Sequence, residues 1–260
     1  MDLRKSYAIA IKDLNEVFSS VEIYGPMLGV PLFFSFILPE LTFYVTQHSA
    51  GSVISSLIAI PASAVGIPAA QGFIFMSFFS VSVLGPIFLT MPILTASVIA
   101  ADSFAGEKER KTAEALLATP ITRSELLLGK IIASLVPTIM LTIAVFFIYG
   151  IVTNHLADQL FQKSILPTTP WLMMLLVGPF LALATIGVVV LVSSHVKGVK
   201  ESQQISTLLA LPILIMPFAA ILGIANLTVS FFEWVIVFLI IMDSLILYIG
   251  VKSFRKEAML

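Results

Sequence analysis

The sequence has few charged side chains and no cysteine. Only 11% of its 260 residues are charged, with 14 Lys and Arg against 15 Asp and Glu, whereas 58% are hydrophobic. Because a soluble domain carries roughly 25% charged residues and needs polar cover, this composition excludes a soluble enzyme. A net charge of −1 excludes nucleic-acid binding, which requires a basic surface. Without cysteine there are no disulfides, zinc-thiolate sites or iron–sulfur clusters. A polytopic membrane protein remains.

Six apolar stretches are long enough to cross a membrane as helices. A spanning helix needs about 20 mainly apolar residues, and lipid offers no partner to backbone groups outside a helix or closed barrel. The stretches lack the alternating pattern of barrel strands, so we predict an all-α membrane protein that forms one transmembrane domain over residues 1–260. The predicted spans are residues 22–44, 76–101, 126–151, 171–193, 205–225 and 231–251.

The basic residues are divided unevenly between the two sides of these spans. All but one of the 14 Lys and Arg fall on one side, and only Lys163 falls on the other. The positive-inside rule therefore predicts that both termini are cytoplasmic. The segment Ser52–Phe75 is also apolar, but counting it as a span would reverse this orientation, and Pro61 and Pro68 interrupt it. We expect an outer loop or a shallow helix that does not cross.

The first residues, 1–21, have the pattern of an amphipathic helix. Leu3, Tyr7, Leu14 and Phe18 fall on one helical face, and most of the charged residues fall elsewhere. Such a helix is expected to lie at the cytoplasmic membrane interface before the first span. The alternative is an ordinary solvated helix.

The segment between the second and third spans is rich in charged residues. Ala113, Leu116 and Leu117 have helical spacing, which predicts a helix over about residues 107–119 that ends before Pro120. We interpret this short charged helix as a contact with another protein. The alternative is a solvated connector.

The next helix has a clear starting signal. Thr122 and Glu125 have the spacing of a capping box, with Ile121 and Leu126 at the flanking positions of a hydrophobic staple. The third span is therefore predicted to begin at Arg123.

The charged segment resembles the signature of the ABC-2 family of exporter permeases. That signature is an acidic residue that closes the second span, followed by E-x-E-x-G-T-x-E-x-L-L-x-x-P-x-x-R-x-x-x-L-x-G-K. Lys111 replaces the usual glycine, which favours a more continuous helix before Thr112. The matching residues are Asp102, Glu107, Glu109, Thr112, Glu114, Leu116, Leu117, Pro120, Arg123, Leu127, Gly129 and Lys130.

The resemblance implies that residues 107–119 form a coupling helix, which docks on a separate ATP-hydrolysing subunit. It implies a non-catalytic permease subunit of an exporter in a prokaryotic plasma membrane. Two ATPase subunits would bind ATP and Mg²⁺, this chain would bind no cofactor, and its permease partner would be a second copy or a similar chain. The residues implied for ATPase coupling are Glu107, Glu109, Thr112, Glu114, Leu117, Pro120 and Arg123, with a second cytoplasmic contact at Lys197, Lys200 and Glu201.

A phosphate-binding loop of the form G-x-x-x-x-G-K-[ST] is missing from the sequence. The nearest approach, Ser124–Ile131, lacks the first glycine and the final hydroxyl. ATP hydrolysis is therefore expected on another chain.

Asp243 is the ionisable residue placed most deeply in the predicted sixth span. Ionisable groups inside a membrane are costly and are usually functional, so Asp243 is a candidate for the substrate pathway. Alternatively, its carboxyl group is hydrogen-bonded to a neighbouring helix. A secondary transporter or channel that uses Asp243 without an ATPase is the alternative function, but it would leave the charged signature unexplained.

Overall fold

The computed structural model describes residues 3–57, 68–110, 121–193, 196, 198–224 and 227–253, and over these residues it is helical without strands. The prediction of an all-α membrane protein is confirmed. Six helical segments are long and apolar enough to cross a membrane, and their limits are Met27–His48, Gly72–Gly106, Ser124–Phe161, Thr169–Ser193, Val199–Ile221 and Val229–Gly250.

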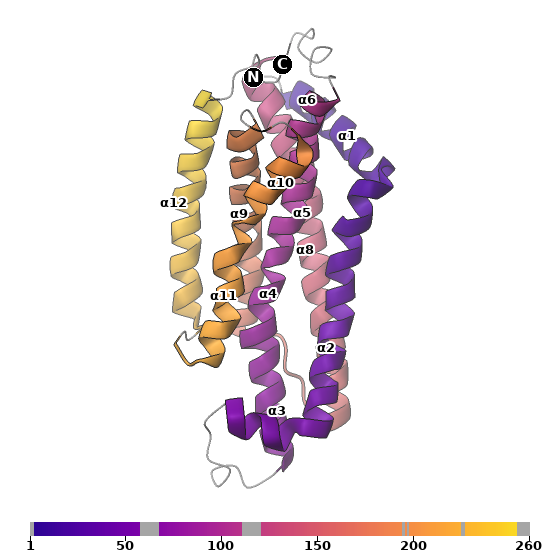
Figure 1. The fold of residues 1–260 in the computed structure, drawn as a ribbon, viewed down its shortest axis with the longest axis vertical. Coiled ribbons are helices and arrows are strands. Elements are labelled where there is room, and N and C mark those ends of the chain that lie inside the picture. Colours follow the sequence, from indigo (N-terminus) through magenta and orange to yellow (C-terminus); the bar gives the residue numbers. More distant parts are fainter. Residues whose placement is uncertain are drawn as a thin grey trace.

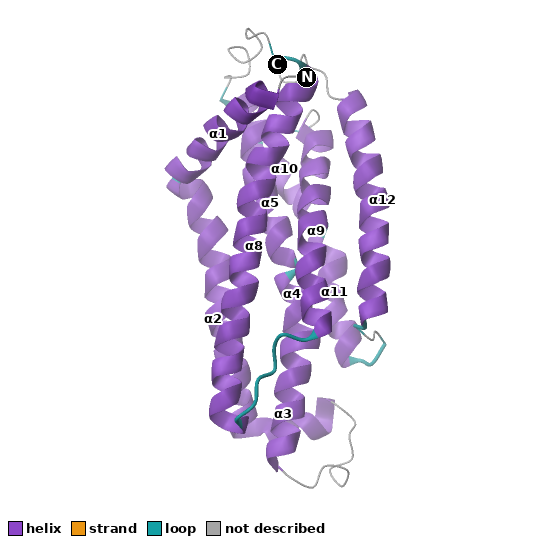
Figure 2. Ribbon diagram, turned by 180° about the vertical axis from the view of Figure 1, so that it is seen from behind, coloured by secondary structure: helices purple, strands orange, loops and turns teal. Residues whose placement is uncertain are grey.

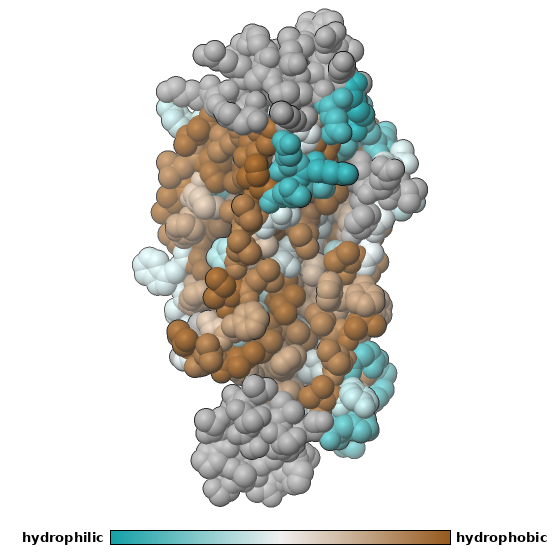
Figure 3. Space-filling view, viewed as in Figure 1, coloured by the Kyte–Doolittle hydropathy of each residue, from teal (hydrophilic) through white to brown (hydrophobic). Residues whose placement is uncertain are grey.

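The spans form an elongated bundle with two distinct ends (Figures 1 and 2). α1 (Leu3–Ser19) runs obliquely across one end, and α2 (Val21–Leu57) descends from it and turns across the opposite end. α12 (Val229–Ser253) finishes at the α1 end. Apolar side chains cover the middle of the face in Figure 3, and hydrophilic side chains gather toward its two ends. This distribution matches a protein whose middle lies in hydrocarbon.

The second span is a composite of α-helix and wider π-helical turns. It extends beyond the predicted 76–101, because the polar residues that follow Ala101 are buried inside the protein and not solvated. Its elements are α3 (Pro68–Phe78), the π-helical turn η2 (Phe79–Leu84), α4 (Gly85–Phe88), α5 (Thr90–Ala101), the π-helical turn η3 (Asp102–Gly106) and α6 (Glu107–Glu109). Of the segment predicted as an outer loop or shallow helix, residues 52–57 end α2 and residues 68–75 lie in α3.

The third span is α8 (Arg123–Phe161), and it begins where the capping signal predicts. The Thr122 side chain accepts a hydrogen bond from the Glu125 backbone N–H at 3.3 Å, and the Glu125 carboxylate accepts one from the Thr122 N–H at 3.0 Å. The helix continues past the predicted Ile151 to Phe161, and Gln162 closes it in the left-handed conformation.

The remaining spans are α9 (Thr169–Ser193), the pair α10 (Val199–Thr207) and α11 (Ala210–Ile221), and α12. The fifth span is thus two helices joined at a short turn. An aromatic cluster joins the second, third and fourth spans, because Phe88, Phe146, Tyr149 and Trp171 pack with ring centroids 4.5–6.2 Å apart. These buried rings fix α4, α8 and α9 against one another.

Candidate functional site

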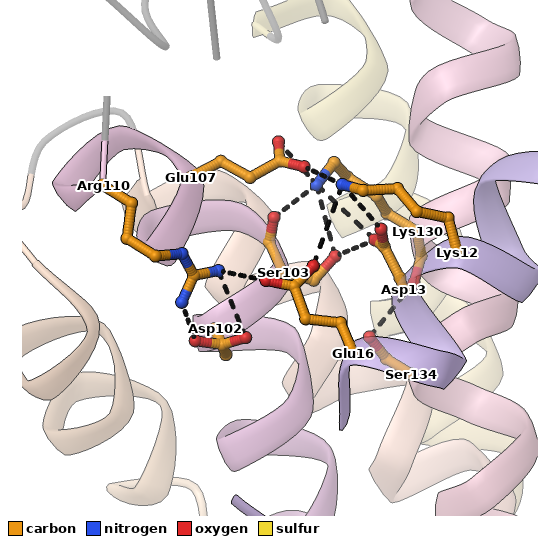
Figure 4. A network of polar contacts seen from close by, with 9 residues as sticks. All are labelled: Lys12, Asp13, Glu16, Asp102, Ser103, Glu107, Arg110, Lys130 and Ser134. Carbon is orange, nitrogen blue, oxygen red and sulfur yellow. Dashed lines mark hydrogen bonds and ion pairs between the residues drawn. The ribbon is translucent and has the colours of Figure 1, made fainter. Parts of the chain in front are cut away.

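Lys130 is the centre of a polar cluster at the α1 end of the bundle (Figure 4). Its side chain has no solvent exposure, and its ammonium group lies 2.9 Å from Glu107 Oε2 and 3.7 Å from Asp13 Oδ2. Lys130 also donates to the Ser103 backbone carbonyl and, at 3.3 Å, to the Ser103 hydroxyl. A buried charge is tolerated when it is paired and hydrogen-bonded in this way.

The π-helical turn η3 supplies both of these hydrogen-bond acceptors, the carbonyl and the hydroxyl of Ser103. In a π-helical turn, wider backbone hydrogen bonds replace the regular i→i−4 bonds of an α-helix. Here the Ser103 carbonyl also accepts a hydrogen bond from Lys130, which lies on another helix. The Ser103 hydroxyl in turn donates to Asp13 Oδ2 at 2.6 Å. A single residue of η3 therefore connects α1 with α8.

Lys12 covers the outer side of the cluster. Its ammonium group lies 3.1 Å from Glu107 Oε1, 3.4 Å from Asp13 Oδ1 and 3.8 Å from Glu16 Oε2. Partial burial lowers the pKa of Lys12, but the charges of Asp13 and Glu107 outweigh that effect and raise this pKa above its ordinary value. Lys12 therefore stays charged and neutralises carboxylates that Lys130 alone would not balance.

Arg110 closes the cluster from the other side. Its guanidinium group donates to Asp102 Oδ1 at 2.9 Å and to Glu16 Oε1 at 3.0 Å. The hydrogen bond to Asp102 raises the pKa of Arg110 above its ordinary value. These contacts join α1, η3 and the residue that follows α6.

Gly129 lets α1 approach α8 closely enough for these pairs to form. A Cβ atom at this position would lie 2.7 Å from the Ser6 carbonyl oxygen and 2.8 Å from Ile9 Cβ. A larger residue would push α1 away from the helix that carries Lys130. The adjacent glycine and lysine therefore have complementary roles: one permits the contact and the other anchors it.

Glu109 connects α6 with the second cytoplasmic loop of the predicted topology. Its Oε2 atom accepts a hydrogen bond from the Val199 N–H at 3.0 Å, and Val199 is the first residue of α10. Gly198 supplies no capping side chain, and a Cβ there would lie 2.8 Å from Glu109 Oε2. Glu109 thus caps α10 from outside, where a negative charge stabilises the helix N-terminus.

The structure brings together part of the set of coupling residues predicted from the sequence. Glu107 is buried and paired within the chain, Glu109 contacts α10, and Lys200 and Glu201 are exposed on α10. Arg123 opens α8. The other predicted coupling residues lie outside the described residues, and they are Thr112, Glu114, Leu117, Pro120 and Lys197.

Sequence reasoning missed the contribution of α1 to this cluster. Asp13 falls on the same helical face as Ser6, Ile9 and Val17, and all four are buried. Their spacing is that of one face of a helix. The sequence signal for this contact was therefore a carboxylate on a helical face whose other residues are apolar or small. It indicates a buried partner of opposite charge.

Asp243 lies elsewhere, on the face of α12 that packs against α9. Asp243 is 4% exposed, and among the described residues neither of its carboxylate oxygens has a hydrogen-bond partner. α9 and α12 are in close contact, because a Cβ on Gly187 would clash with Ile246. The structure does not bring Asp243 to the cluster around Lys130.

The six apolar helices, with the charged cluster around Lys130 at one end of their bundle, define a polytopic helical membrane protein. Among the described residues, no group of His, Cys, Asp and Glu has the arrangement of a metal site. The chain belongs to the ABC-2 family of transporter proteins, because the model of that family matches residues 7–234. It is a membrane transport component, and membership implies association with an ABC ATPase. No curated protein matches the chain. Asp243 lies outside the matched residues.

Proposed function

We propose that this chain is the permease subunit of an ATP-driven ABC exporter, which couples a separate ATPase to the movement of a substrate out of the cytoplasm. The observation that supports this function is the cluster at the base of the charged segment, in a chain of the ABC-2 family. Glu107 pairs with α1 and α8, and Glu109 caps α10. A displacement of the segment that follows would therefore be transmitted to three helices.

In this mechanism Glu107 and Glu109 transmit movement inside the permease. Docking on the ATPase falls to Thr112, Glu114, Leu117 and Pro120, with Arg123 beside them. Lys197, Lys200 and Glu201 form the second contact, which moves with the first because Glu109 holds the start of α10. A segment that contacts a rotating subunit can pass that rotation to the helices attached to it.

The orientation of α1 supports the placement of this end at the cytoplasmic membrane surface. One face of α1 packs on α8, whereas Tyr7, Ile11 and Phe18 form an exposed apolar stripe. An apolar stripe beside a polar face is the pattern of an interfacial helix. Both termini would then be cytoplasmic.

The working assembly contains two permease chains, either identical or similar, and two ATPase subunits. This chain would be non-catalytic, and ATP and Mg²⁺ would bind to the ATPases. ATP binding would draw the ATPases together, move the coupling segments and open the pathway between the permeases outward. Hydrolysis would reset the assembly.

Glu114→Lys tests this function. In vesicles that contain the permease and its ABC ATPase partner, we expect ATP hydrolysis to continue while ATP-dependent transport is lost. The expected cause is that reversal of the charge on the coupling segment disturbs the docked contact. Glu233→Lys makes the same charge change at the opposite end of the bundle, on an exposed residue, and should leave transport unchanged.

Two outcomes would contradict the proposal. Normal transport by the Glu114→Lys variant would remove the coupling role from this segment. Transport that needs no ATPase and is lost in Asp243→Asn would instead favour a secondary transporter or channel.

A further inference from the structure

An apolar groove lies between α8 and α9 at the end of the bundle opposite α1. Its volume is about 240 Å³. The groove is formed by two turns of α8, the first two turns of α9 and the segment that connects the helices, drawn in teal in Figure 2. The lining residues used below are Phe147, Gly150, Ile151, Asn154, Leu166, Leu172 and Leu175.

Gly150 is the residue that leaves this space open. Gly129 and Gly178 face neighbouring atoms so closely that an added Cβ would lie within 2.7 and 3.1 Å of them, so close packing accounts for the missing side chain. At Gly150 the nearest atom to such a Cβ is Leu166 Cδ1, at 4.0 Å. Helix contact therefore does not require a glycine here, and its effect is to create a cavity.

Asn154 lines the groove, and its polar atoms form hydrogen bonds with the connecting segment. Its Oδ1 atom accepts from the backbone N–H groups of Ile165 and Leu166 at 2.9 and 2.8 Å, and its Nδ2 atom donates to the Leu166 carbonyl. An ordered water needs two or more polar partners. Because both polar atoms of this side chain have partners within the chain and the other lining side chains are aliphatic or aromatic, the groove suits an apolar occupant.

The mouth of the groove opens on the face of the bundle that would contact lipid. Phe147, Ile151 and Leu172 are 61%, 68% and 50% exposed, and all belong to membrane spans. Leu175 lines the groove six residues after the start of α9, which is about 9 Å along a helix. The groove thus lies along the first part of the fourth membrane span.

We propose that this groove binds an acyl chain of a phospholipid from the leaflet opposite the α1 end. The mouth lies among exposed apolar side chains, the lining is almost entirely apolar, and a flexible alkyl chain fits the space between the two helices. The site depends only on these helices crossing the membrane. It does not depend on ATPase coupling, so its failure would leave the proposed function intact.

Photolabelling tests the site in the full chain, reconstituted in phosphatidylcholine vesicles. A phosphatidylcholine with a diazirine midway along one acyl chain should label peptides containing Phe147, Ile151 and Leu172 at least five-fold more than peptides of α11. α11 provides the comparison because Ile215 and Phe218 are exposed to a similar extent on another membrane span.

Gly150→Trp should fill the groove and reduce its labelling to the level of α11. Ala144→Trp is the matched control, since Ala144 is exposed on the same helix but does not line the groove, and its labelling should be unchanged. Gly150→Leu, with the melting temperature of each variant, separates loss of binding from loss of fold.

Equal labelling of the groove and α11, or full labelling in folded Gly150→Leu and Gly150→Trp, would overturn the proposal. So would preferential labelling by a diazirine fatty acid over the phospholipid, because the occupant would then be a single-chain amphiphile.

Discussion

Lys130 and Asp243 are both ionisable side chains buried among helices, yet their surroundings are opposite. Lys130 is surrounded by Asp13, Ser103 and Glu107 from three other elements, α1, η3 and α6. Asp243 has no hydrogen-bond partner among the described residues and lies between α12 and α9. The comparison shows that Lys130 holds helices together, whereas the packing around Asp243 gives its carboxyl group no stabilising partner.

The comparison also shows where the chain can accommodate charge. The Lys130 cluster lies at one end of the bundle, where Lys12 and Arg110 reach solvent and complete the pairing. α9 contributes no charged residue opposite Asp243. Charge is therefore stabilising where several elements converge and is costly where only two apolar helices meet.

Lys130→Met should have the largest effect on stability. It would leave Glu107 and Asp13 buried without their central cation, and breaking a buried pair in this way costs about 3–5 kcal/mol. The free energy of unfolding in detergent micelles, followed by circular dichroism, measures this loss. Lys200→Met removes an exposed lysine and serves as the control. A loss below about 1 kcal/mol would mean that the cluster is not the anchor described above.

Asp243→Leu should have a smaller effect of the opposite sign. It removes a buried group without a hydrogen bond, whose burial costs about 1–3 kcal/mol, so the free energy of unfolding should rise. Asp243→Asn keeps a polar group and should give less stabilisation. A folded Asp243→Leu protein without transport activity would instead assign the carboxyl group to the substrate pathway.

Glu16→Gln should have the smallest effect. Glu16 pairs with Arg110 and Lys12 at the exposed rim of the cluster, and exposed pairs contribute less than about 1 kcal/mol. The same unfolding measurement in low and high salt should show a small difference from wild type that salt removes. A loss as large as that of Lys130→Met would erase the distinction between the rim and the centre.

Local patterns allowed much of the fold to be predicted. Apolar length predicted six spans, and the pair Thr122 and Glu125 predicted where α8 begins, because a capping box involves only neighbouring residues. The ends of the second and third spans were harder to predict from the sequence. Asp102 and Asn154 are polar residues that suggest a helix end in water. In the structure, tertiary partners bury Asp102, and Asn154 holds a loop against its own helix.

The candidate site could be predicted only in part for the same reason. The charged signature indicated Glu107, Glu109 and Lys130 as a linear motif. The pairing of Lys130 with Asp13 requires α1 to cross α8 at Gly129, a contact between residues more than a hundred positions apart. No spacing rule within one helix predicts that crossing, so the part played by Asp13 appears only in three dimensions.

Because α8 is continuous, the distance between its two polar positions sets the membrane thickness that the protein matches. Lys130 at one end and Asn154 at the other are 24 residues apart on one helix, which corresponds to about 36 Å. A bilayer has a hydrocarbon core of about 30 Å, so the two polar positions bracket it with little to spare. A markedly thicker membrane would have to deform around α8 or draw polar groups into hydrocarbon, and a thinner one would tilt the whole bundle.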